Sequence, residues 1–343
     1  ASHPPRGTSP LTEEGGRGWG WPEYPGQTSP SLTLPARGRV STERPDEEAQ
    51  MLRDKKQEYL TALVLVGPFI LIYGVLFVWP TIQMVLLSFT DAPLIGPGDW
   101  VGVANYVEIL SHRLFSAAFW NTAYFVALTV IPSTLISLLI AMAVNRLKGG
   151  LQGLVLACFF LPYILPVSVV FMTWNWIIDV QYGLVQYIVR PFNGGEPMSL
   201  TRTIPAFMPT VAFVTVWWTM GFNILLFIAG LRNISPEIYE AAQLDSAGRW
   251  RQFSHITWPL VWPVTALVLT IQLIAQLKIF DQVYLFSIGG RQDATITLVQ
   301  YVYKLAFQQN RGGEAATAAV LLFAMIIILS VLQYQVLRIR GDK

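Results

Sequence analysis

The sequence predicts an all-α integral membrane protein with six transmembrane helices, and three observations support this fold class. Hydrophobic residues make up 53% of the chain and charged residues only 13%, whereas soluble proteins carry about 25% charged residues. The mean hydropathy is +0.46. The apolar residues are gathered into long blocks, and about twenty such residues cross the roughly 30 Å hydrocarbon core of a bilayer as an α-helix.

Six apolar blocks are long enough to cross the membrane. They are residues 60–79, 119–144, 153–178, 206–231, 261–277 and 315–337. The fifth block is the shortest and is followed by Lys278 and Asp281, so the pattern does not fix its outer boundary. Prolines within the blocks, such as Pro132 and Pro209, predict helix kinks, which neighbouring helices make tolerable in lipid. These kinks either serve packing alone or let the bundle open and close.

The first 50 residues are predicted to be disordered. They contain many Pro, Gly, Ser, Thr and Arg residues and almost no apolar periodicity, so they cannot bury enough surface to offset the entropy lost on ordering. No apolar core follows the early arginines, so a secretory signal peptide is not expected. The tail is either a passive extension or a partner-binding segment. Residues 51–59 are predicted to form an amphipathic lead-in along the membrane surface, and residues 60–340 the transmembrane domain.

The distribution of basic residues predicts the orientation. Lysine and arginine are commoner in the segments that share a side with the N-terminus, including Arg146, Lys148, Arg249 and Arg251, than in the longer segments on the other side. Because cytoplasmic segments are enriched in these residues, both termini are expected to be cytoplasmic. The expected location is the cytoplasmic membrane of a bacterium or archaeon.

A polar stretch between the fourth and fifth blocks stands out. Residues 237–263 read EIYEAAQLDSAGRWRQFSHITWPLVWP. Helix formers open this stretch, Ser246-Ala247-Gly248 interrupts it, and a second helical run leads to Pro259. The pattern predicts a cytoplasmic helix–turn–helix held at the membrane face, a shape suited to docking on a partner.

This stretch resembles the EAA motif of permease subunits of binding-protein-dependent ABC importers. Glu240-Ala241-Ala242 match its first residues, Asp245 and Gly248 follow at the usual places, and Ile256 to Pro259 match its end. Ser246 stands where a glycine is usual and Trp258 where a leucine is usual. Other stretches are similar to sugar-type permeases: residues 67–91, 102–106, 120–122 and 280–307. The resemblance covers residues 60–340 and is closest to the maltose- and glycerol-phosphate-type branch.

The resemblance implies the type I ABC importer permease fold, with residues 237–259 as a coupling loop that docks on a cytoplasmic ATPase. Glu240 and Asp245 would offer carboxylates to basic groups, and Ala241 and Ala242 would allow close approach. Ser246 and Gly248 would permit the turn, and Ile256 and Pro259 would end the motif. A solvated amphipathic loop is the alternative. The implied partners are a second permease of different sequence, an ATPase dimer that binds ATP and Mg²⁺, and an extracytoplasmic binding protein.

Polar and aromatic residues within the spans are candidates for the substrate path. They are Asn175, Trp217, Trp218, Asn223, Gln272 and Gln276. Amides hydrogen-bond sugar hydroxyls and aromatic rings stack on sugar C–H faces, and polar groups within membranes often mark pathways. Alternatively, the amides join helices and the tryptophans form an interfacial belt. The expected substrate is a sugar or related polyol, with glycerol phosphate or another small solute as the alternative.

Other function classes find little support in the sequence. A nucleic-acid partner is not expected at a net charge of +2. The chain has no G-x-x-x-x-G-K-[ST] loop and its three histidines are scattered, which argues against an ATPase or an intramembrane metalloenzyme. An ion channel is disfavoured because no selectivity sequence or arginine-rich sensor helix is found. No catalytic residue, metal site or cofactor is expected, and the single cysteine, Cys158, is expected to be buried as a small hydrophobic residue.

Overall fold

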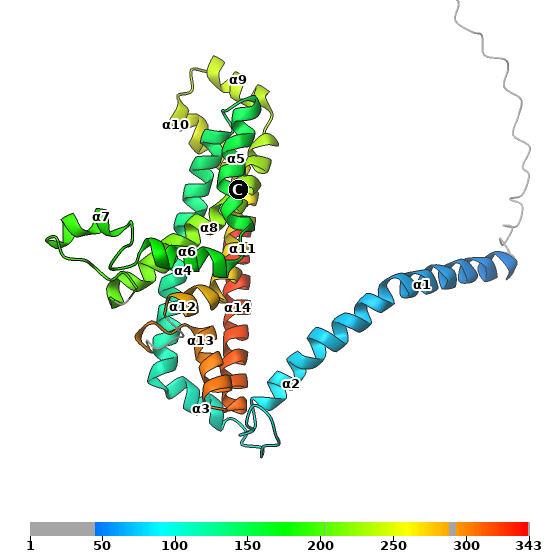
Figure 1. Ribbon diagram of the computed structural model, residues 1–343. Helices are drawn as coiled ribbons and strands as arrows, with labels where there is room; N and C mark the ends of the chain where they lie inside the picture. Colours follow the sequence, from blue (N-terminus) through cyan, green and yellow to red (C-terminus); the bar gives the residue numbers. More distant parts are fainter. Residues whose placement is uncertain (1–44, 202, 288–292, 342–343) are drawn as a thin grey trace, which may run out of the picture. The chain divides into compact units, whose positions relative to one another are not determined.

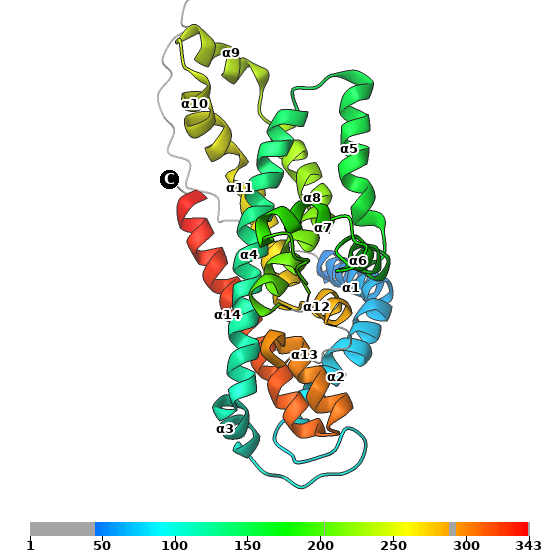
Figure 2. The ribbon, with the colours of Figure 1, turned by 60° about the vertical axis from the view of Figure 1, so that its left-hand side comes forward.

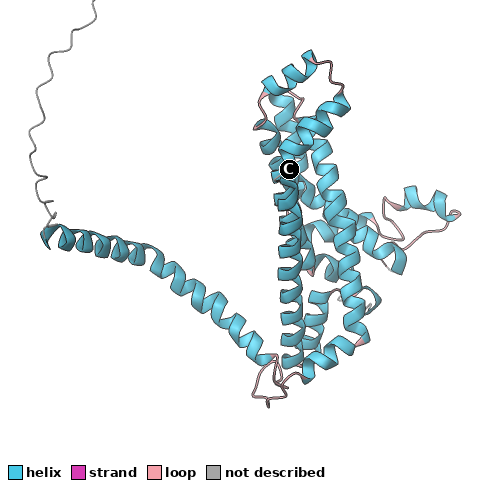
Figure 3. Ribbon diagram, turned by 180° about the vertical axis from the view of Figure 1, so that it is seen from behind, coloured by secondary structure: helices cyan, strands magenta, loops and turns pink. Residues whose placement is uncertain are grey.

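The computed structural model describes residues 45–201, 203–287 and 293–341, of which residues 45–54 and 338–341 are described by their backbone alone. In this part of the chain, helices are joined by loops, and the single isolated β-bridge pairs Thr90 with Trp100 (Figure 3). The all-α prediction is therefore confirmed. The chain divides into two units, residues 1–67 and 68–343. The predicted disordered tail lies, as far as residue 44, outside the described residues.

The first span is formed by α1 (Pro45–Tyr73), a π turn η1 (Gly74–Val78) and α2 (Trp79–Leu87). Residues Lys55–Leu87 are long and apolar enough to cross a membrane. The π turn lies just before Pro80. A proline ring in a regular α-helix meets the carbonyl four residues earlier, here that of Leu76. The wider π turn holds that carbonyl out of the regular α-helical position. The predicted lead-in, residues 51–59, lies within α1.

Four long helices form most of the core of the second unit. They are α4 (Arg113–Val144), α8 (Ile204–Arg232), α11 (Trp258–Leu277) and α14 (Gly312–Gly341). Helices α4 and α8 pack along each other, and α11 packs against α4, α8 and α14. Buried apolar side chains, among them Phe125, Phe227 and Val268, fill the spaces between them. These helices contain the second, fourth, fifth and sixth predicted spans, and each is long and apolar enough to cross a membrane.

The third predicted span is not one straight helix. Helices α5 (Gly149–Ile164) and α6 (Val167–Ile177) are bent by 99° where they meet. Pro166 cannot donate a backbone hydrogen bond, and it forces Leu165 into an extended conformation with ψ of 140°. The expectation for Cys158 is also wrong, because this residue is exposed on α5. The described residues thus contain five continuous spans, or six if the bent pair counts as one.

Short helices gather at the two ends of the long ones (Figures 1 and 2). One end carries α9 (Pro236–Leu244), α10 (Arg249–Gln252) and a π turn η3 (Phe253–Thr257). The opposite end carries α3 (Ala104–Ser111), α13 (Leu298–Tyr303) and a π turn η5 (Lys304–Gln308). The remaining short elements are α7 (Gln186–Val189), η2 (Arg190–Asn193), α12 (Asp281–Phe286) and η4 (Asp293–Thr295).

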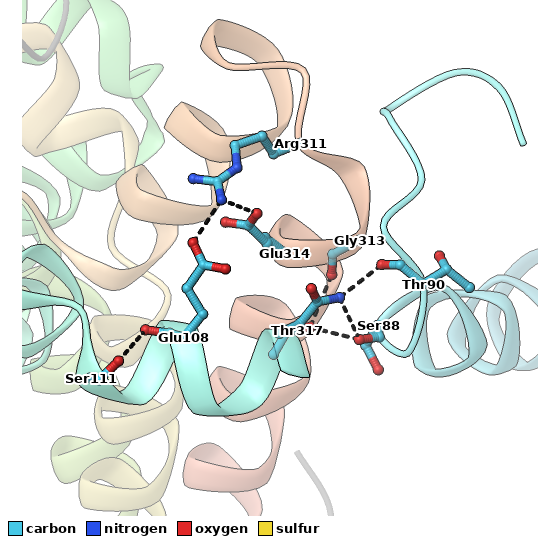
Figure 4. Close-up of polar contacts among 9 residues, drawn as sticks. Ser88, Thr90, Glu108, Ser111, Arg311, Gly313, Glu314 and Thr317 are labelled. Carbon is cyan, nitrogen blue, oxygen red and sulfur yellow. Dashed lines mark hydrogen bonds and ion pairs between the residues drawn. The ribbon is translucent and has the colours of Figure 1, made fainter. Parts of the chain in front are cut away.

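A polar cluster joins the end of α2 to α3 and to the start of α14. Asn105 Nδ2 donates to the backbone oxygens of Ser88 (3.0 Å) and Thr90 (2.7 Å). Thr317 Oγ1 also lies at hydrogen-bonding distance from the Ser88 oxygen, at 2.9 Å (Figure 4). Gly313 packs so closely that a Cβ atom there would lie 1.8 Å from the Thr90 oxygen. We call Ser88, Thr90, Asn105, Gly313 and Thr317 the inter-span lock.

Charged groups flank this lock on its solvent side. Arg311 donates to Glu108 at 2.8 Å and also pairs with Glu314 (Figure 4). Burial lowers the pKa of Arg311, but the hydrogen bond to Glu108 and the charge of Glu314 outweigh it and raise the pKa above its ordinary value. Burial, with the negative charge of Glu314, raises the pKa of Tyr301 to about 12. Both groups therefore keep their protons at neutral pH.

Candidate coupling loop and substrate path

The polar stretch predicted as a coupling loop is a helix–turn–helix at one end of the bundle (Figure 2). Its first helix, α9, has Pro236 at its first turn, where the missing N–H costs nothing. The carboxylates of Glu240 and Asp245 are exposed, as is Ala241, whereas Ala242 is buried. The acidic side chains of the motif are therefore available to a partner.

The turn after α9 is a Schellman motif centred on Ser246. The Ser246 N–H donates to the Gln243 oxygen at 3.0 Å, and the Ala247 N–H donates to the Ala242 oxygen at 2.9 Å. Ser246 has a φ of 56°, the left-handed conformation that this motif requires. Glycine adopts this conformation without strain, which explains why the family motif usually has a glycine at this position. Gly248 has an ordinary φ of −63° and precedes α10.

The second arm of the loop is tied to the first. The hydroxyls of Tyr239 and Thr257 lie 2.9 Å apart, and Gln252 Nε2 donates to the Ala247 oxygen at 2.9 Å. Ile256 packs against the core of the bundle, whereas Pro259 is exposed. These contacts make the loop a single unit fixed to α8 and α11.

Two exposed apolar residues of the loop were missed by the sequence analysis. Leu244 is 88% exposed and Trp250 is 77% exposed, one on each side of the turn. Between the arms lies a cavity of about 250 Å³, lined by Ala242, Asp245, Ala247, Arg251, His255 and Ile256. In the sequence, the sign of this apolar surface was Trp250, a tryptophan in an otherwise polar loop. The surface therefore offers apolar contacts as well as carboxylates.

Three of the candidate path residues are buried inside this chain. Asn223 is 1% exposed and its Nδ2 donates to Ser133 Oγ of α4 at 2.9 Å. Gln272 and Gln276 are each 4% exposed, and Gln276 Nε2 donates to Gln272 Oε1 at 2.9 Å. The Asn223 bond joins α8 to α4 and the Gln272–Gln276 bond lies within α11, so their placement favours the alternative role of joining or stiffening helices.

The other three candidates are partly exposed near the bent pair. Trp217 packs edge-on against Trp174 at 5.4 Å between ring centroids, and Trp218 Nε1 donates to the Leu165 oxygen at 3.2 Å. Asn175 lines a cavity of about 450 Å³ together with Val169, Met172, Thr173 and Trp176. Trp176 lies next to Asn175 in the sequence and adds an aromatic ring to this surface. Thr173 is a further polar group of this surface that the sequence analysis missed, because the bend was not predicted.

The described residues hold no group of three or more His, Cys, Asp or Glu side chains placed to bind a metal ion. The arrangement described above combines one partly exposed amide, Asn175, with partly exposed aromatic rings near the bent helix pair, and it has an acidic and apolar docking surface at one end. It fits a transport subunit that works with other chains.

Comparison with known proteins decides the family. Residues 133–340 match the model of the binding-protein-dependent transport system inner membrane component. The chain belongs to this family. It is therefore a multi-pass membrane protein of the permease class, a transport subunit rather than an enzyme, and the resemblance noted in the sequence is confirmed.

Several individual relatives are similar in sequence to this permease along most of its length. It is 33% identical to the inner membrane ABC transporter permease protein YcjO of Escherichia coli over 82% of this chain and 96% of that protein. It is 30% identical to the arabinooligosaccharides transport system permease protein AraP of Bacillus subtilis, over 78% of this chain and 85% of that one. It is 29% identical to the sn-glycerol-3-phosphate transport system permease protein UgpA of Salmonella typhimurium, over 79% and 92%.

A solved structure shares the fold of this permease. The crystal structure of a bacterial ABC transporter that imports the acidic polysaccharide alginate aligns with a TM-score of 0.74 and 22% sequence identity. The alignment covers 84% of this chain and 98% of that one. The predicted type I importer permease fold is therefore confirmed.

Proposed function

We propose that this permease forms half of the solute path of an ATP-driven importer for a sugar or related polyol. The observation that carries the proposal is the exposed Glu240 and Asp245 surface on a rigid helix–turn–helix at one end of the bundle. Charge-assisted hydrogen bonds to these carboxylates are the stronger kind, so this surface suits basic groups of a cytoplasmic ATPase dimer. The ATPase would bind ATP and Mg²⁺, and its closure would select one of two conformations of the permease.

The second half of the path would come from another permease of different sequence. Asn175, Trp217 and Trp218 are all partly exposed on this chain, so a solute that meets them needs a second wall. Relatives named for arabinooligosaccharides, for trehalose and maltose, and for sn-glycerol-3-phosphate support a sugar, with a phosphorylated polyol as the alternative. An extracytoplasmic binding protein would deliver the solute at the end that carries α3 and α13. Both termini and the coupling loop would then face the cytoplasm, in keeping with Arg249 and Arg251 in the loop.

Co-purification from the native membrane tests this proposal. We expect the wild-type chain to bring down an ATPase and a second permease, and Glu240→Lys to lose mainly the ATPase, because the substitution places a positive charge opposite basic groups. Glu196→Lys is the matched control, since Glu196 is also exposed but lies between α7 and α8. If the wild-type chain purifies alone and still moves solute after reconstitution, the proposal is wrong.

A further inference from the structure

Residues 179–201, between α6 and α8, carry apolar side chains where a water-exposed loop would carry polar ones. On the short helices α7 and η2 and the turn before them, large apolar side chains are 67–87% exposed. They are Tyr182, Leu184, Tyr187, Ile188 and Phe192. Soluble surfaces rarely hold so many large apolar residues together, and this segment belongs to none of the spans.

Specific hydrogen bonds hold these side chains outward. Gln186 is 3% exposed, its Nε2 donates to the Met198 oxygen at 2.9 Å, and its Oε1 accepts from the Met198 N–H at 3.1 Å. The Val185 N–H donates to the Ile177 oxygen at 3.0 Å, which fixes α7 to the end of α6. The segment is thus built so that one side faces the protein and the apolar side faces away from it. Figures 1 and 3 show α7 standing away from the long helices.

The helix that follows the segment indicates where the segment lies along the membrane normal. Helix α8 has 29 residues, and its length of about 43 Å exceeds the roughly 30 Å hydrocarbon core. A helix of this length can cross the core with both ends outside it, so its first residue, Ile204, and the segment that precedes it lie at one end of the span. Tyrosines and apolar residues at this depth are typical of membrane anchors.

A cavity under the same segment is almost wholly apolar. It has a volume of about 310 Å³ and is lined by nine residues: Trp174, Ile178, Val185, Leu200, Ala206, Pro209, Thr210, Phe213 and Val214. The Thr210 hydroxyl already donates to the Ala206 oxygen at 2.8 Å, so it offers little to a sugar. Hydrocarbon suits this lining better than a hydroxylated solute.

From these observations we infer that residues 179–193 form a lipid-binding anchor. Tyr187, Ile188 and Phe192 lie at the boundary between headgroups and acyl chains, and one phospholipid acyl chain occupies the apolar cavity. The anchor holds the end of α6, and with it Asn175, at a fixed depth in the bilayer. This role does not depend on which solute is carried.

Spin-label accessibility in the complete transporter, reconstituted in phospholipid vesicles, tests the inference. A nitroxide is placed at position 188 by Ile188→Cys in a Cys158→Ser background, and the signal of that background alone is subtracted. We expect the nitroxide at position 188 to collide often with oxygen, which concentrates in lipid, and rarely with a water-soluble nickel chelate. The ratio of the oxygen collision rate to the nickel collision rate should be several-fold higher than for a nitroxide introduced by Glu196→Cys.

Two results would overturn the inference. A position 188 as open to the nickel chelate as position 196 would place the segment in water. A position 188 shielded from both reagents would mean that a protein, such as the binding protein or the second permease, covers it.

A cavity-filling variant gives a second, independent measurement. Ala206→Phe should fill the cavity and lower the number of phospholipids retained by the intact complex in native mass spectrometry. Ala157→Phe, on an exposed face of α5, is the control and should leave that number unchanged. Equal retention by the two variants would contradict lipid occupancy of the cavity.

Discussion

At the scale of single residues, Ser246 shows how strongly one backbone angle limits the coupling loop. Its φ of 56° lies in the left-handed region, which costs an L-residue roughly 1–2 kcal/mol relative to glycine. Two backbone hydrogen bonds of the Schellman motif depend on that conformation. The residue therefore acts on docking through the shape of the turn.

Ser246→Gly is expected to keep ATPase binding and to stabilise the loop, whereas Ser246→Val is expected to weaken binding. A β-branched side chain makes the left-handed conformation costlier by about 1 kcal/mol or more. Retention of the ATPase during co-purification, measured against salt concentration, checks both variants. Equal retention by glycine and valine at this position would show that the turn adopts another conformation in the complex.

Among the path candidates, burial separates two groups that the sequence treats alike. Asn223 is buried and bonds to Ser133 at 2.9 Å, whereas Asn175 lines a surface cavity and donates only a long bond, of 3.4 Å, to the Leu285 oxygen. Asn223→Leu is expected to lower thermal stability, by about 0.6 kcal/mol for one hydrogen bond between membrane helices, with little change in the solute concentration that half-saturates uptake. Asn175→Leu is expected to raise that concentration with little loss of stability. Uptake by proteoliposomes and thermal unfolding in detergent measure the two effects, and the reverse pattern would contradict this assignment.

At the scale of elements, two of the Trp-Pro pairs in the chain share one local structure. Each pair, at Trp79 and at Trp258, follows a π turn. In a regular helix the Pro259 ring would meet the carbonyl of His255, which here lies inside the turn η3. A π turn adds one residue to a helical turn, so it rotates everything before it by about 100° relative to a regular helix. The direction in which the coupling loop faces depends on this turn.

Pro259→Ala removes the steric cause of the π turn and is expected to partly uncouple transport from ATP hydrolysis. The loop would rotate away from its docking surface once a regular helix forms. The ratio of solute uptake to ATP hydrolysis in proteoliposomes measures this, and it should fall. Pro263→Ala, on the same helix but without a π turn before it, is the control and should keep the ratio. An unchanged ratio for Pro259→Ala would show that the π turn has another cause.

The sequence predicted elements better than it predicted their interruptions. Block length and hydropathy identified the long helices, and the EAA residues placed the coupling loop. The 99° bend was missed because Pro162 and Pro166 permit either a mild kink or a break, and which one forms depends on packing against α8 and α12. The sequence pattern also could not predict that Asn223, Gln272 and Gln276 are buried, since burial depends on which helix faces which neighbour. The exposure of Cys158 was not predicted for the same reason, because the sequence does not show which face of α5 packs against its neighbours.

At the scale of the whole molecule, the inter-span lock connects parts of the chain that are far apart in sequence. Asn105 and Thr317 share the Ser88 carbonyl, so α2, α3 and α14 meet at one point. The sequence stretches that resemble the first helix of sugar-type permeases, and the Gly102 to Tyr106 stretch after it, meet here.

Gly313→Ala is expected to destabilise the second unit by about 1–3 kcal/mol, because the added methyl would overlap the Thr90 carbonyl and force the lock apart. Gly153→Ala is the control, since a Cβ there meets open space and alanine favours the helix by about 1 kcal/mol. Thermal unfolding of the two variants in detergent should therefore shift in opposite directions. A Gly313→Ala protein as stable as the wild type would mean that the helices separate at this point without cost.

The bend between α5 and α6 changes the thickness of the barrier that a solute has to cross. With 16 residues, α5 reaches about 24 Å, which is short of the roughly 30 Å hydrocarbon core. The helix therefore breaks at membrane depth, where lipid does not tolerate free backbone polar groups. Trp218 satisfies the Leu165 carbonyl and the Leu165 N–H donates to the Pro162 oxygen. The last carbonyls of a helix have no partner within it, so those of α5 require water or a neighbouring protein. A hydrated recess beside α6 would shorten the dry part of the route to a fraction of the bilayer, so that a small movement of α6 would suffice to open or close it.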